Sequence, residues 1–379
     1  MDGNQGMSRG GPPSREPSGM PGSLNIGYIP ALHHLRCLAA TLVFVTHYLH
    51  YYLYRWTPQP KMFMFGLFVE GHTGVGLFFS LSGFLFTTIA FSGTSNIQYG
   101  QFLKNRLLRI FPLYIFVFFI ALAIGNDSIH GTNILDFLLP NAGSPISMSL
   151  ITGAAWTIPV EFSFYLVFPF LVRFYRTDGS IYLFRLIALL LAAKAGVFLA
   201  VARPDLTIYA TVVGRMDQFL IGMLAAGWSL RRREGLKRYG PWLLAASTAA
   251  TILALAALAR YASLYGPPRN WLWLFWPTIE AVLWSAVIVG YVAVQPRWPR
   301  WLDAALQRGG EISYSLYMLH CLAIYGLYQT VGRIAFTGRL RLDMALNAIP
   351  VVLLTLWLAG TSYAVIERPF LRLRGRYIG

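Results

Sequence analysis

Long apolar segments place the tightest limit on what this chain can fold into. The first runs from residue 31 to 53, ALHHLRCLAATLVFVTHYLHYYL, and is long enough to cross a bilayer as a helix, which takes roughly 20 residues. The chain is 56% hydrophobic and only 12% charged, whereas a soluble domain carries about 25% charged residues. These features predict an all-α integral membrane protein.

Ten segments share this character, and both ends of the chain are expected in the cytoplasm. The predicted spans are 31–53, 74–92, 108–125, 154–174, 181–202, 206–229, 240–260, 272–294, 312–335 and 344–366. If the first span enters from the cytoplasm, 20 of the 31 lysines and arginines fall on that side and 7 on the other. Positive residues favour the cytoplasmic side, so the split supports a bundle of about ten transmembrane helices.

The net charge of +16 has the same explanation and does not indicate a nucleic-acid partner; the expected surroundings are membrane lipids. Residues 1–28 are rich in Gly, Pro and Ser and predict a disordered cytoplasmic tail. Residues 29–379 then form one integral domain. Cys37 and Cys321 both lie in apolar spans without metal-site spacing, so no metal is predicted.

Arg36 and His47 stand out because they are ionisable groups within the first span. They are eleven residues apart, which returns to nearly the same helix face roughly 16 Å further along. Ionisable groups inside a membrane usually face a polar cavity or a site. A neutral His47 could accept a proton from a hydroxyl group, although a histidine bonded to a neighbouring helix is an equally plain interpretation.

Three further groups of polar residues are candidates for a site. Arg106 and Arg109 share a helix face at the cytoplasmic boundary, where they could bind phosphate or only anchor the helix. Glu161 is a carboxylate in an apolar span and needs a cation or donors; it could orient a histidine, hold a substrate hydroxyl, or form a structural ion pair with Arg36 or Arg215.

The third group consists of Ser313, Tyr317 and His320, which can share one helix face. Such a stripe lines a cavity or locks helices together. A different function class, a secondary transporter of a small anionic solute, would use the buried Lys194, Arg215 and Asp217 to bind ions. The chain has no GKS/T loop, CxxC pair, HExxH or GxSxG element, which argues against nucleotide-driven pumps, zinc proteases and ordinary serine hydrolases.

Six sequence elements together resemble the membrane acyltransferase-3 family. They are Arg36-x10-His47, GVGLFFSLSGFLF at 74–86, RLLRIFPLY at 106–114, WTIPVEFSFY at 156–165, SYSLYMLH at 313–320 and ERPF at 367–370. The resemblance implies a ten-helix domain, in the bacterial inner membrane, that transfers an acyl group from cytoplasmic acyl-CoA to an acceptor hydroxyl. Acetyl is the default acyl group, and the implied acceptor is a carbohydrate, a lipid-linked glycan or another exported molecule.

The resemblance also implies roles for individual residues. His47 is then the essential histidine and the general base, Arg36 is its paired cation, and Arg106 and Arg109 match the family's arginine pair, which suits the phosphates of the donor. Glu161 matches a recurrent polar position and is a further catalytic candidate. His320, Tyr317 and Ser313 are candidates for the substrate site. No cofactor is expected to be tightly bound, since acyl-CoA acts as a donor substrate. Direct transfer is favoured over a covalent acyl-histidine.

Overall fold

The structure, a computed structural model, describes residues 24–53, 66–93, 96–124, 154–264 and 269–378. All regular structure in these ranges is helical, apart from one isolated bridge between Ile97 and Ile378. The α-helices are α1 (Pro30–His47), α2 (Gly66–Val69), α3 (Thr73–Ser92), α4 (Tyr99–Ile124), α6 (Thr157–Asp178), α7 (Ser180–Ala200), α8 (Pro204–Ala210), α9 (Val212–Arg231), α10 (Arg233–Tyr261), α11 (Leu272–Val294), α12 (Arg300–Glu311), α13 (Ser313–Thr330), α14 (Leu340–Ser362) and α15 (Arg368–Leu371). Two π-helical turns, η1 (Tyr48–Leu53) and η3 (Tyr363–Glu367), continue α1 and α14.

Each predicted span overlaps one helix of at least 18 residues in the described part of the chain. Six helical stretches are both long and apolar enough to cross a membrane: α3, α6, α7, α10, α11 and the run from α14 to α15. The chain is therefore an all-α, multi-pass membrane protein. That α1, α4, α9 and α13 cross as well stays a prediction.

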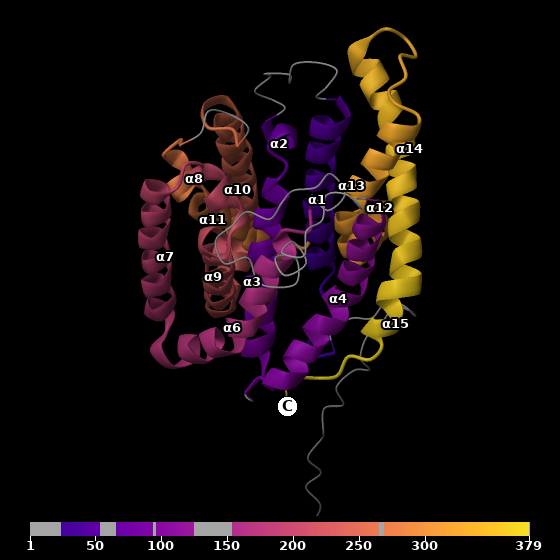
Figure 1. Cartoon of the computed structure of the whole chain (residues 1–379). Coiled ribbons are helices and arrows are strands. Elements are labelled where there is room, and N and C mark those ends of the chain that lie inside the picture. The colour runs from indigo at the N-terminus through magenta and orange to yellow at the C-terminus, as the bar shows by residue number, and fades with distance from the viewer. Residues whose placement is uncertain (1–23, 54–65, 94–95, 125–153, 265–268, 379) are drawn as a thin grey trace, which may run out of the picture.

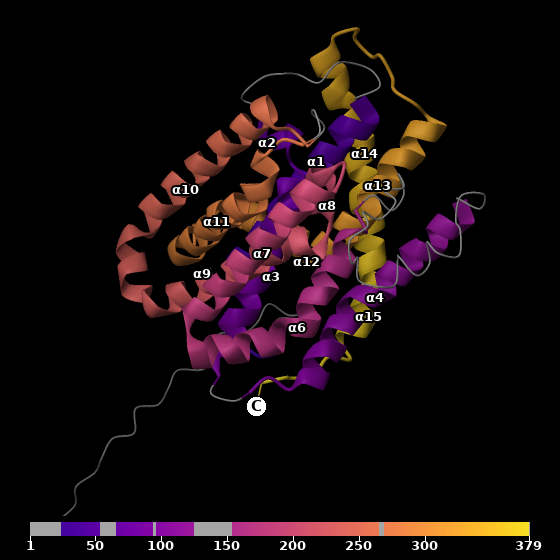
Figure 2. The same ribbon diagram turned by 60° about the vertical axis from the view of Figure 1, so that its left-hand side comes forward.

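The helices form two groups that meet at α1 and α3. Helices α7, α9, α10 and α11 lie on one side, and α12, α13 and α14 lie on the other (Figure 1). Helices α9, α10 and α11 pack against one another (Figure 2), and α1 contacts α3, α12 and α13. Helix α1 thus lies between the two groups, and its residues Arg36 and His47 face the interior of the bundle.

Glycines allow the central helices to approach closely. A Cβ atom on Gly74 would lie 2.3 Å from the Ala39 carbonyl oxygen of α1, and one on Gly83 would lie 2.1 Å from the Phe219 carbonyl oxygen of α9. Small residues let helix backbones pack at this distance. The GVGLFFSLSGF segment is therefore a packing motif on both sides of α3.

Two predicted spans differ from the helices observed. The helix at the span predicted as 108–125 begins at Tyr99, because hydropathy marks only the apolar part of a helix whose N-terminal half carries Arg106 and Arg109. The span predicted at 206–229 is two helices, α8 and α9. Thr211 between them is extended, and its hydroxyl caps α9 by accepting a hydrogen bond from Gly214 N at 3.4 Å.

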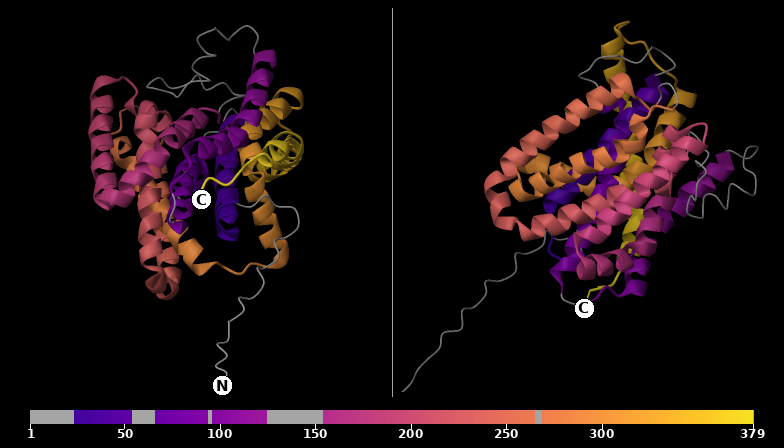
Figure 3. Two further views of the ribbon diagram at one scale, coloured as in Figure 1. Left: turned by 90° about the horizontal axis from the view of Figure 1, so that it is seen from below. Right: turned by 90° about the vertical axis from the view of Figure 1, so that its left-hand side faces the viewer.

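The two described ends of the chain meet at one end of the bundle. Asn25 Oδ1 accepts hydrogen bonds from the backbone N–H groups of Tyr377 and Ile378, at 3.0 and 3.2 Å. Seen from below, the last residues cross the lower face of the bundle (Figure 3, left). Residues 24–28, predicted as part of the tail, therefore pack on the domain; residues 1–23 of that tail lie outside the described residues.

Candidate active site

A cavity of about 160 Å³ lies at this end of the bundle. It is bounded by residues of α1, α3, α4, α6, α12 and α13 and by both described chain ends. Its charged lining consists of Arg36, Arg106, Arg109, Arg374, Glu161 and Glu311. We call this space the arginine cavity. Its excess of guanidinium groups suits an anionic ligand.

Aromatic rings and one carboxylate hold the two arginines of α4. The Arg106 guanidinium lies 4.7 Å from the centre of the Phe86 ring, and that of Arg109 lies 6.0 Å from the Tyr314 ring. Arg109 Nη1 is also 3.8 Å from Glu367 Oε2. As the spacing predicted, both arginines face one site, although they lie well inside α4 and not at its start.

Glu161 lies in the same cavity and is held by hydroxyl groups. Ser82 Oγ donates to Glu161 Oε1 at 3.1 Å, and the Tyr165 hydroxyl donates to the same oxygen. Its negative charge acts on Arg36, which lines the cavity with it. The alternative ion pair with Arg215 is wrong, because Arg215 Nη1 is bonded to Glu280 Oε2 at 2.8 Å.

A smaller cavity of about 40 Å³ adjoins the first. The two cavities share the residues Arg36, Phe78, Glu161 and Tyr314 as lining. Ser313, Tyr317 and Thr157 line only the smaller one. The Tyr317 hydroxyl bonds to Thr157 Oγ1 at 3.0 Å. Its ring centre is 6.1 Å from that of His320, so the polar face of α13 leads from the cavities to His320.

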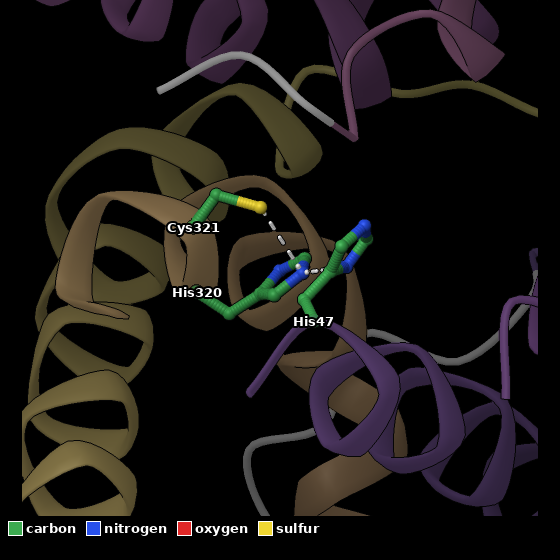
Figure 4. A group of neighbouring side chains, drawn as sticks. All are labelled: His47, His320 and Cys321. Atoms are coloured by element: carbon green, nitrogen blue, oxygen red, sulfur yellow. Dashed lines mark hydrogen bonds between the residues drawn. The ribbon is translucent and has the colours of Figure 1, made fainter. Parts of the chain in front are cut away.

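His320 and His47 form a hydrogen-bonded pair whose proton positions can be assigned. His320 Nδ1 lies 3.2 Å from the Leu316 carbonyl oxygen, which can only accept, so this nitrogen carries the proton in the neutral ring. His320 Nε2 is then an acceptor, and His47 Nδ1, 2.7 Å away, donates to it. The lone pair of a neutral His47 is therefore on Nε2, which points away from His320 (Figure 4).

Cys321 brings a third potential metal ligand to the pair. Its Sγ lies 3.4 Å from His320 Nε2, and the ligand atoms of His47, His320 and Cys321 all lie within 4.8 Å of one another. Sequence spacing gave no sign of this group, because His47 and Cys321 come from opposite ends of the chain. The short distance between the two ring nitrogens is that of a hydrogen bond.

The structure separates the residues that the sequence had grouped around His47. Arg36 and Glu161 belong to the arginine cavity, whereas His47 pairs with His320. Eleven residues of α1 separate Arg36 from His47 by roughly 16 Å. Arg36 and His47 therefore share a helix face as predicted, but they belong to two different sites along α1. Of the α13 residues, Ser313 and Tyr317 line the smaller cavity and His320 supports His47.

Two residues that line the arginine cavity, Tyr165 and Arg374, and one beside it, Glu367, were not singled out from the sequence. Glu367 was read as part of an anchor, yet it is 1% exposed and accepts a hydrogen bond from Ser315 as well as attracting Arg109. Tyr165 holds Glu161. Arg374 lines the cavity from beyond the last helix. A buried acid after a span is a signal that could have identified Glu367.

The buried charges on which the transporter alternative depended pair with carboxylates. Lys194 Nζ of α7 lies 2.6 Å from Asp217 Oδ2 of α9, and Arg215 is bonded to Glu280 of α11. All four side chains are at most 2% exposed. These ion pairs connect neighbouring helices, which is sufficient reason for charges in these positions.

The comparisons with known proteins agree with this architecture. Residues 29–364 match the acyltransferase-3 family, described as an acyltransferase domain, and the chain belongs to this family. It is 25% identical to an acyltransferase, MdmB, of Streptomyces mycarofaciens over 92% of this chain and 93% of that protein. It is 27% identical to nodulation protein 10 of Rhizobium leguminosarum bv. viciae, over 90% and 92% of the two chains.

A third relative shares a shorter region. The O-acetyl transferase of Shigella phage Sf6 is 32% identical over 35% of this chain and 42% of its own length. No solved structure is a significant match. The family and the apolar helices together define the chain as a membrane acyltransferase.

Proposed function

We propose that this protein transfers an acyl group, acetyl in the simplest case, from cytoplasmic acyl-CoA to a hydroxyl group of an acceptor. The observation that carries the proposal is that α1 connects two sites. Arg36 lies in an arginine-lined cavity, and His47 presents a lone pair roughly 16 Å further along the same helix. A donor with an anionic head and a reactive group at the end of a long arm fits this arrangement.

The arginine cavity is the proposed site for the phosphates of CoA. Arginine binds phosphate through two parallel N–H donors, and Arg106 and Arg109 face the cavity together. The pantetheine arm would follow the smaller cavity past Tyr317 toward the histidine pair. Acyl-CoA enters and leaves as a substrate, so no tightly bound cofactor is part of the proposal.

His47 acts as the general base in this scheme. Its Nε2 takes the proton of the acceptor hydroxyl as the oxygen attacks the thioester carbonyl carbon. The tetrahedral intermediate then breaks its C–S bond, and the proton on His47 passes to the departing thiolate. His320 Nε2 accepts the His47 Nδ1–H bond throughout, which keeps His47 oriented and stabilises its positive charge.

The acceptor and the membrane orientation complete the proposal. We place the arginine cavity and both chain ends in the cytoplasm, in agreement with the distribution of basic residues. The acceptor approaches His47 from the other side, which suits a carbohydrate or lipid-linked glycan at the bacterial inner membrane. The name of the phage relative supports acetyl as the group transferred.

Inside-out membrane vesicles supplied with acetyl-CoA labelled in the acetyl group test this function. The enzyme should incorporate label as an alkali-labile ester, whereas a transporter would accumulate label that is released unchanged when the vesicles are lysed. Replacing the base in His47→Ala should lower incorporation by about 10²–10⁴-fold. His50→Gln, in the next turn, is the matched control. Undiminished transfer by His47→Ala would reject the proposed base.

Binding of CoA tests the donor site separately. Loss of a charge-assisted hydrogen bond costs about 1.5–3 kcal/mol, so Arg106→Ala and Arg109→Ala should each weaken CoA binding by about tenfold or more. Lysine at either position keeps the charge but loses the forked geometry, and we expect intermediate affinity. Unchanged affinity in all four folded variants would show that these arginines only anchor α4.

A further inference from the structure

The segment that follows the last helix is fastened across the arginine cavity. Asn105 of α4 holds Gly375 by two hydrogen bonds, donating to its carbonyl oxygen at 2.7 Å and accepting from its N–H at 3.1 Å. The backbone of Tyr377 bonds to Gln98 N at 2.9 Å and to Asn25. Its side chain is 2% exposed and packs on Phe102. Residues 374–377 are therefore held in place by α4 and by residue 25.

This attachment carries one of three neighbouring arginines into the cavity. Arg374 lines it, whereas Arg372 and Arg376 are exposed. Arg374 Nε donates to the Leu371 carbonyl oxygen at 2.9 Å. This hydrogen bond fixes the position of the guanidinium group at its Nε atom. The side chain then faces the same space as Arg36, Arg106 and Arg109.

The positively charged arginines that line the cavity repel one another, and a bound anion would reduce this repulsion. Burial, together with the charges of Arg109 and Arg106, lowers the pKa of Arg374 to about 10. The buried Nε of Arg106 has no hydrogen-bond partner within the described part of the chain. Facing these guanidiniums, Glu161 is engaged by Ser82 and Tyr165, and Glu311 by Arg308 and Tyr363.

We infer that Arg374 binds phosphate together with Arg106 and Arg109, and that it completes the donor site with Gly375 and Tyr377 of the same segment, which also line the cavity. The inference rests on the proposed function, because it assigns the phosphates of acyl-CoA to the arginine cavity. The ligand class is a molecule with several phosphate groups and a flexible arm. A donor without phosphates would make no use of Arg374.

Equilibrium binding of CoA to the purified full chain tests this assignment. Arg374→Gln should weaken binding by about tenfold or more, and Arg374→Lys should recover part of the loss. Arg372→Gln and Arg376→Gln remove the same charge from the same segment at exposed positions. They should bind CoA as the wild type does, which excludes a general effect of net charge.

Pantetheine and 3′-dephospho-CoA serve as further probes. Pantetheine has no phosphate, so its weak binding should not change in Arg374→Gln. 3′-Dephospho-CoA lacks only the 3′-phosphate, so if Arg374 contacts that phosphate, Arg374→Gln should bind dephospho-CoA as the wild type does. If wild-type protein binds CoA and Arg374→Gln binds it equally well, the role of Arg374 is refuted while the proposed function stands. If wild-type protein does not bind CoA, the proposed function itself fails.

Discussion

The chemistry of single residues in this bundle depends on their hydrogen-bond partners. His47 could be a structural histidine by sequence alone, but the Leu316 carbonyl fixes the His320 tautomer, and His320 then fixes that of His47. A backbone carbonyl oxygen can only accept a hydrogen bond. His320 must therefore donate to Leu316 through Nδ1 and accept from His47 through Nε2. The base is thus defined by a residue 273 positions away.

We predict that His320 positions His47, so replacing it should lower kcat without changing the KM for acetyl-CoA. Its hydrogen bond to the charged form of His47 is lost in His320→Ala, so we expect a decrease of about 10–100-fold. His320→Gln offers a carbonyl acceptor and should restore part of the rate. Steady-state kinetics on both variants decide the matter; a wild-type kcat for His320→Ala would contradict the assignment.

Metal removal should leave the transfer rate unchanged. Two imidazole nitrogens bound to one tetrahedral zinc ion at about 2.0–2.1 Å would stand roughly 3.3 Å apart, whereas His47 Nδ1 and His320 Nε2 are 2.7 Å apart. The measurement is acetyl transfer after treatment with EDTA or 1,10-phenanthroline. Loss of activity that added Zn²⁺ restores would show instead that His47, His320 and Cys321 hold a metal ion.

Helices place these residues through close backbone contacts. Gly83 of α3 meets the Phe219 carbonyl of α9, and Gly310 at the end of α12 meets the His33 carbonyl of α1. The second contact lies beside the arginine cavity. Glycine is required at such points because any side chain would separate the helices, and the cavity walls would move with them.

Gly83→Ala should therefore destabilise the protein by about 1–3 kcal/mol, the usual cost of overpacking. The new Cβ would lie 2.1 Å from backbone that cannot rotate away. Gly196→Ala on α7 is the matched control, since nothing lies within 4 Å of its Cβ position, and it should be neutral or stabilising. Thermal unfolding of both variants in detergent compares them; equal stability would contradict the packing account.

The molecule as a whole brings the two ends of its described chain to one side of the bundle. Asn25 bonds to Tyr377 and Ile378, and Asn105 bonds to Gly375. Ends on the same side agree with an even number of membrane crossings, and their closeness makes both of them walls of the arginine cavity. Orientation then decides which compartment supplies the donor.

We predict that this side faces the cytoplasm. Single cysteines at Thr177, in the last turn of α6, and at Ala335, after α13, test it in a Cys37→Ser, Cys321→Ser background. Both positions are exposed, and the ends of α6 and α13 at which they lie are predicted on opposite sides of the membrane. A membrane-impermeant maleimide applied to intact cells should label Ala335→Cys and spare Thr177→Cys. The reverse pattern would invert the topology.

The long helices of this protein could be predicted from its sequence, because hydropathy is a local property. Each of the ten apolar ranges overlaps a long helix, and the pairing of Arg106 with Arg109 on one face followed from helical geometry. The broken helix at Thr211 was missed because its cause is a local cap within an apolar segment. The early start of α4 was missed because charged turns of a helix have no apolar signature.

The contacts between polar residues could not be predicted in the same way, because they depend on how the helices pack. Arg36 and His47 share a face, yet one lies in the arginine cavity and the other on His320, because each depth in the bundle has different neighbours. Glu161 meets Ser82 and Tyr165, and Arg215 meets Glu280. A charge in lipid must find a partner, but which helix supplies that partner depends on packing between segments far apart in the chain.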